Sequence, residues 1–173
     1  MQNGKSWKTK HFKRRIKKIE FDKSIKNWKM IIVKFGGSSL SNPENIRRAA
    51  DIVNNNQRKI IVLSAMGNST DLLKKINDFN KINEAKAAFS VLSELESYYK
   101  NIIKNLLGGK KEYAKIISLI NERFYRLNLL LEQNPGKDIY NRIITSGELI
   151  SSDIFYYYLY SRGIFSILVN AYE

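Results

Sequence analysis

Two short apolar runs, each ending in a loop of small residues, place the strongest constraint on the fold of this chain. The first run covers residues 30–35 and leads into a pair of glycines, and the second covers residues 59–64 and leads into a loop with one glycine. A helical pattern over residues 43–53 lies between them. Strand, helix and strand in this order form a βαβ unit, which predicts a parallel sheet.

The helix between the two strands carries a start signal. Ser41 is the expected cap, Pro43 suits the first turn, and Glu44 stands at the capping-box spacing from Ser41. Apolar residues then recur at helical spacing, as expected of a helix with one buried face: Ile46, Ala49, Ala50 and Val53.

The middle of the chain changes character and predicts a helical insertion. Another helix is expected to start at residues 68–71, and residues 82–133 show two amphipathic patterns that end near glycine-containing stops. A further helix is expected to open at residues 145–148, and residues 164–169 are expected to form a third strand. The predicted class is α/β: a partial parallel-sheet fold with a helical insertion between the second and third strands.

The positive charge is concentrated at one end of the chain. The formal net charge is +14, of which residues 1–29 carry +9. We expect residues 1–29 to be a basic extension and residues 30–173 to be the folded part. An arm that binds nucleic-acid phosphates is a less favoured alternative for the basic segment.

Composition excludes several kinds of site. The chain has no cysteine and one histidine, His11, so disulfides, thiolate chemistry and histidine metal clusters are excluded, and we expect no metal-ligating residue. There is no apolar run long enough to cross a membrane. The expectation from composition is a cytoplasmic protein with no membrane partner.

The segment after the first strand has the residues of a phosphate-binding loop. Lys34 supplies a point charge at the strand end, and Gly36 and Gly37 allow backbone N–H groups to approach an anion, with Ser38 beside them. The spacing is neither that of a Walker A loop nor that of a dinucleotide fingerprint. The alternative is an ordinary turn that needs glycine conformations, with Lys34 merely exposed.

The loop after the second strand occupies the equivalent position. It offers Ser64, Ala65 and Thr70, and ligands of open parallel sheets bind beyond the carboxyl ends of the strands. Helix capping by Ser69, Thr70 and Asp71 is the alternative. A third motif contains Glu148, which could bind a substrate amine or complete a capping box with Thr145.

Taken in order, these motifs resemble one family. KFGGSS at residues 34–39, IIVLSAMGNSTDLL at residues 60–73 and TSGELISS at residues 145–152 are similar to the aspartokinases of the amino acid kinase family. The resemblance covers residues 30–173 and corresponds to the N-terminal half of the catalytic domain.

The resemblance implies phosphoryl transfer from ATP, with Mg²⁺, to the side-chain carboxylate of L-aspartate. This is the first step toward lysine, threonine and methionine. The resemblance assigns Lys34 a catalytic role, in which it neutralises phosphate charge. It assigns Glu148 the binding of the substrate amine. It also places the following residues in the nucleotide–aspartate crevice: Gly36, Gly37, Ser38, Ser64, Ala65 and Thr70. Such chemistry needs positioning and charge rather than a protein nucleophile.

The sequence departs from the family beyond the third predicted strand. It contains neither the Gly-Gly-Ser-Asp segment nor the regulatory ACT domains of the aspartokinases. We therefore expect a truncated or split form, with a separate chain as one source of the second half. The alternatives are another amino acid kinase, a catalytically inactive fragment, and a basic nucleic-acid-binding protein that acts through residues 1–29.

Overall fold

The computed structural model describes residues 30–133 and 136–170, so the predicted basic extension at residues 1–29 lies outside the described residues. The elements, in chain order, are β1 (Ile31–Phe35), the 3-10 turn η1 (Ser38–Leu40), α1 (Pro43–Val53), β2 (Lys59–Leu63), α2 (Ser69–Lys81), α3 (Ala85–Leu107), α4 (Tyr113–Leu131) and α5 (Lys137–Ser161).

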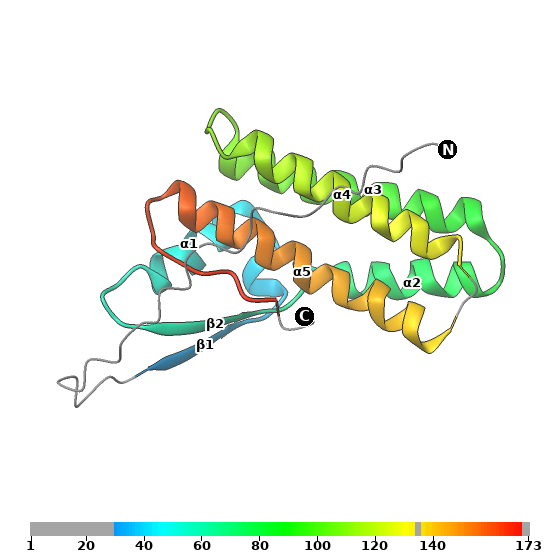
Figure 1. Cartoon of the computed structure of the whole chain (residues 1–173), viewed down its shortest axis with the longest axis horizontal. Helices are drawn as coiled ribbons and strands as arrows, with labels where there is room; N and C mark the ends of the chain where they lie inside the picture. The colour runs from blue at the N-terminus through cyan, green and yellow to red at the C-terminus, as the bar shows by residue number, and fades with distance from the viewer. Residues whose placement is uncertain (1–29, 134–135, 171–173) are drawn as a thin grey trace, which may run out of the picture.

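The two predicted strands form a parallel pair. β1 and β2 are aligned from the Ile31–Lys59 pair to the Phe35–Leu63 pair, and α1 connects them (Figure 1). Because the strands run in the same direction, their carboxyl ends and the loops that follow lie at one edge of the sheet. The predicted βαβ unit is confirmed.

The helices predicted to follow the second strand are also confirmed. The helix α5 contacts α2, α4 and β2, while α3 packs on α2 and α4. Figure 1 shows α3 and α4 as the layer farthest from the strands, with α5 between that layer and the sheet. The rings of Phe35 and Phe155 join sheet and bundle, with centroids 6.1 Å apart. No helix in residues 30–133 and 136–170 is long and apolar enough to span a bilayer.

One face of the sheet is covered and the other is open among the described residues. Val33 and Phe35 of β1 pack into the core on the side of α5. On the opposite face Ile32 is 70% exposed, and Ile60 and Val62 of β2 are exposed as well. Parallel sheets normally have both faces covered, so the outer face of this pair is an unusually apolar surface.

We expect Ile32→Lys to reduce self-association of the chain and its binding of an apolar dye. The side chain is already in water, so the change should alter the free energy of unfolding by no more than about 0.5 kcal/mol. Size-exclusion chromatography and dye fluorescence measure the two effects. Ile32→Val is the matched control and should behave as the parent. Equal dye binding by the lysine variant and the parent would contradict this account of the outer face.

The predicted third strand is wrong for the described residues. Residues 164–169 follow α5 without being assigned to a strand, and Ile164 N–H donates instead to the carbonyl of Leu159 at 3.0 Å, closing the end of the helix. Phe165 is 90% exposed. The pattern of residues 164–169 favours an extended backbone, but a strand also needs a neighbouring edge with which to pair.

Two predicted helix starts are displaced. Asn42, and not Ser41, caps α1, because the Asn42 side chain accepts a hydrogen bond from Asn45 N–H at 2.9 Å. The predicted start at residues 145–148 is wrong: α5 begins at Lys137, and Thr145 lies within it and donates to the Asn141 carbonyl at 2.8 Å. A Thr-x-x-Glu pattern has capping geometry only where the backbone is not already helical.

Candidate functional site

The two strand-end motifs meet at the carboxyl edge of the sheet. Lys34 is exposed near the end of β1, and its Nζ donates to Ser64 Oγ at 3.4 Å. The Ser64 N–H donates to the Phe35 carbonyl at 3.1 Å, which extends the pairing of the strands by one step. Lys34 and Ser64 were proposed separately from the sequence, and the parallel register brings them into contact.

Position 37 requires glycine because there is no room for a side chain, and not because the backbone conformation is unusual. Gly37 has ordinary right-handed angles, with φ −57° and ψ −41°. A Cβ atom there would lie 2.7 Å from the Gly67 carbonyl oxygen and 2.8 Å from that of Ala65. Gly67 N–H donates to the Gly37 carbonyl at 2.9 Å. The left-handed angle lies in the second loop, at Gly67 with φ +56°.

Gly36 and Ser38 complete the first loop. A Cβ atom at Gly36 would meet no atom within 4 Å, so packing does not require glycine there. Ser38 is exposed, and its carbonyl accepts hydrogen bonds from Ser41 Oγ and Asn45 Nδ2, both at 2.9 Å. These bonds fold the loop back onto the start of α1.

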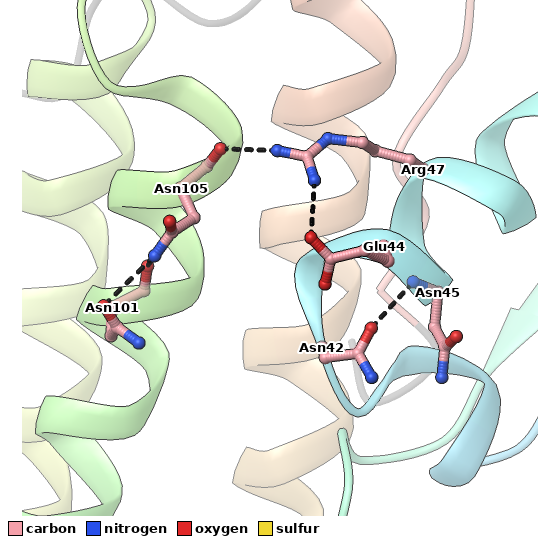
Figure 2. A network of polar contacts seen from close by, with 6 residues as sticks. All are labelled: Asn42, Glu44, Asn45, Arg47, Asn101 and Asn105. Atoms are coloured by element: carbon pink, nitrogen blue, oxygen red, sulfur yellow. Dashed lines mark hydrogen bonds and ion pairs between the residues drawn. The ribbon is translucent and has the colours of Figure 1, made fainter.

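The start of α1 is in turn tied to α3. Figure 2 shows Arg47 reaching between them: one guanidinium nitrogen donates to the Asn105 carbonyl at 2.8 Å, and another pairs with Glu44 at 3.1 Å. The helical insertion therefore supports the element that follows the first loop.

The second loop is buried against the bundle. Ala65 is 3% exposed, and Ser69 Oγ donates to the Met66 carbonyl at 2.6 Å. Thr70 is half-buried in the first turn of α2. No side-chain hydrogen bond caps the described start of α2, so the capping alternative for this motif does not hold.

The third motif reaches the second loop through a glycine. A Cβ atom at Gly147 would lie 2.9 Å from Ala65 Cβ and 2.9 Å from Leu73 Cδ1, so only glycine lets α5 approach this closely. Glu148 follows on the same turn and is half-buried. Because this turn lies inside α5, Glu148 does not cap a helix, and the capping alternative is wrong.

A cleft opens beside the first loop. It has a volume of about 340 Å³ and is lined by Phe35, Ser38, Ser39, Asn45, Arg48, Ala49 and Ile52. Within residues 30–133 and 136–170, no group of three or more histidine, aspartate or glutamate side chains gathers to hold a metal ion.

Sequence reasoning missed two residues that shape the site. Tyr98 of α3 donates from its hydroxyl to the Ser41 carbonyl at 2.8 Å, whereas the sequence predicts only an amphipathic helix in this region. Gly147 is part of the TSGELISS motif, but the reason for a glycine there becomes clear only from its position in the middle of α5. A glycine inside a helix carries an energetic cost and so signals close packing.

Comparison with known proteins agrees with this arrangement. Residues 29–172 match the model of the amino acid kinase family. Over 141 residues, 75% of this chain, the sequence is 27% identical to bifunctional aspartokinase/homoserine dehydrogenase 1 of Zea mays, of which it covers 15%. Over 76 residues, 44% of the chain, it is 37% identical to the aspartokinase of Chlamydia pneumoniae, of which it covers 16%.

The fold matches a solved aspartokinase. The structure of E. coli aspartokinase III with aspartate and ADP superposes with a TM-score of 0.69 at 24% identity, over 78% of this chain and 30% of that one. The chain thus spans less than a third of the length of each of these relatives. With the three sequence motifs gathered at one edge of a parallel sheet and the family model matched over nearly all the described residues, the chain belongs to the amino acid kinase family.

Proposed function

We propose that this chain forms the N-terminal part of an aspartate kinase, which transfers a phosphoryl group from ATP to the side-chain carboxylate of L-aspartate and gives 4-phospho-L-aspartate. The single observation that carries the proposal is the contact of Gly147 with Ala65. This contact brings the Glu148 turn to the loop that holds Ser64, which accepts a hydrogen bond from Lys34 at the end of β1. A substrate amine and a nucleotide phosphate would then bind side by side.

We assign the candidate site residues their roles according to their charge. Lys34 is an exposed cation at the strand end and would neutralise charge on the transferring phosphoryl group. Backbone N–H groups of Gly36 and Gly37 and the hydroxyls of Ser38, Ser64 and Thr70 are the neutral donors of the crevice. Glu148 would pair with the α-ammonium group of aspartate and so fix the carboxylate that attacks. In-line positioning of that kind supplies most of the catalysis in phosphoryl transfer.

The proposal that a nucleotide binds here rests on the hydrogen-bond donors of the crevice and on a similar solved structure. The similar E. coli aspartokinase III was solved with ADP. An exposed lysine beside hydroxyl groups fits polyphosphate chemistry. Since the described residues hold no cluster of metal-ligating side chains, Mg²⁺ would be held largely through the phosphates and would offset their charge.

A complete enzyme of this kind needs more protein than this chain supplies. Among the described residues the outer face of the sheet is open, and Lys34 lies exposed on that face beside Ile32 and Val62. The E. coli relative is more than three times longer than the part that superposes. We propose that the remainder of the kinase domain, on the same polypeptide or a separate one, closes the crevice. The activity would be the cytoplasmic entry step to lysine, threonine and methionine.

A hydroxamate assay for aspartyl phosphate tests the proposal. The 173-residue chain alone should show negligible ATP-dependent formation of aspartyl hydroxamate, because half of the crevice is open and positioning is lost. The chain completed with the remainder of the kinase domain should form it. Ordinary kinase rates from the isolated chain would overturn the requirement for completion. Phosphorylation of glutamate in preference to aspartate by the completed enzyme would overturn the proposed substrate.

A further inference from the structure

We propose that Tyr98 is a positioning residue that holds the loops after β1 and β2 in one fixed arrangement. Its relevance to catalysis rests on the proposed function, in which these two loops bind the nucleotide phosphates and the substrate. Tyr98 belongs to α3, the helical layer far from the strands, and no sequence motif of the site includes it.

The Tyr98 phenol lies between the two loops. Its hydroxyl donates to the carbonyl of Ser41, at the end of the first loop, at 2.8 Å. On the other side, a Cβ atom built at Gly67 would lie 2.8 Å from the Tyr98 hydroxyl oxygen and 3.5 Å from Cζ. The ring therefore occupies the space that any side chain at Gly67 would need.

Further hydrogen bonds link Ser41 and Gly67 to the candidate phosphate-binding residues. Ser41 Oγ donates to the Ser38 carbonyl at 2.9 Å, and Ser41 N–H donates to the same carbonyl at 3.4 Å. Gly67 N–H is bonded to the Gly37 carbonyl at 2.9 Å. Tyr98 thus restrains both loops at points one hydrogen bond away from Gly37 and Ser38.

The Tyr98 ring is itself held by the bundle. Its centroid lies 5.4 Å from that of Tyr99, and the Tyr99 ring lies 6.2 Å from that of Phe124 on α4. Burial raises the pKa of Tyr98, so the hydroxyl remains a proton donor to Ser41 at neutral pH. A rigid aromatic anchor with one donor at its tip is suited to fixing a loop.

Tyr125 on the adjacent helix provides a matched control. It belongs to α4, and its side chain is 61% exposed. Tyr125→Phe removes the same atom as Tyr98→Phe, from the surface of a helix that packs on α3 and α5.

Amide hydrogen exchange on the 173-residue chain tests the restraint directly. Tyr98→Phe should speed exchange about fivefold at residues 38–42 and 64–68 together, because one hydrogen bond is lost, and should leave exchange in α3 and α4 unchanged. Tyr125→Phe should leave both loops as in the parent. Unchanged exchange in the loops of the Tyr98 variant, or faster exchange throughout the bundle, would overturn the proposal.

Calorimetric titration with ADP and Mg²⁺ separates this inference from the proposed function. Tyr98→Phe should weaken ADP binding about fivefold, and Tyr125→Phe should not change it. If the parent binds no ADP while the loop exchange responds as expected, the loop restraint stands and nucleotide binding by this chain fails. If both variants bind ADP as tightly as the parent, Tyr98 has no role in positioning the nucleotide site.

Discussion

Replacing Lys34 with alanine is expected to lower turnover of the completed kinase by about 100-fold or more. The lysine is the charge that we assign to the transferring phosphoryl group, and loss of one such electrostatic contact costs about 2.7–4 kcal/mol of transition-state stabilisation. The side chain is exposed, and its hydrogen bond to Ser64 is long, at 3.4 Å, so folding should be almost unaffected. Steady-state hydroxamate assays and thermal melting measure the two quantities.

A lysine elsewhere on the surface controls for net charge. Lys86 is exposed on α3, in the helical layer, and Lys86→Ala removes the same charge from the chain. That variant should keep the turnover of the parent. If Lys34→Ala retains turnover within a factor of about three of the parent, the assignment of Lys34 to the phosphoryl group is wrong.

Local patterns predicted the elements whose order decides the fold. The two apolar runs predicted β1 and β2, and the 3.6-residue periodicity predicted α3 and α4. A helix with one buried face has apolar residues that recur with the helical period, so the sequence pattern reveals it. The site residues at the carboxyl ends of β1 and β2 could be placed near one another from the sequence, since parallel strands end at one edge of the sheet. Lys34 and Ser64 are in contact for that reason.

Long-range packing could not be predicted. Residues 164–169 have strand propensity, but pairing depends on an edge that the local sequence does not describe. Ser41 and Thr145 both match capping patterns, yet the backbone path selects Asn42 in one case and a helix interior in the other. The contact between Tyr98 and Ser41 joins positions 57 residues apart, and nothing local to either marks it.

Replacing Glu148 with glutamine is expected to weaken aspartate affinity of the completed kinase by about 10–100-fold. The change keeps the size of the side chain and removes its charge, and a hydrogen bond to a charged group contributes about 1.5–3 kcal/mol. Glu148 lies in the interior of α5, where glutamate and glutamine have similar helix propensity, so melting should change little. Affinity for ATP should be nearly unaltered, because Glu148 is assigned to the amine and not to the phosphates.

Separate titrations with aspartate and ATP decide between a substrate role and a structural one. Glu94→Gln on the exposed surface of α3 is the matched control and should leave both affinities unchanged. A purely structural Glu148 would weaken both ligands together or lower the melting temperature, since α5 packs on Ala65 through the adjacent Gly147. Selective loss of aspartate affinity requires a contact with the amino acid itself. Unchanged aspartate affinity in Glu148→Gln would remove Glu148 from the substrate site and leave only Gly147 of that motif with a role, in packing.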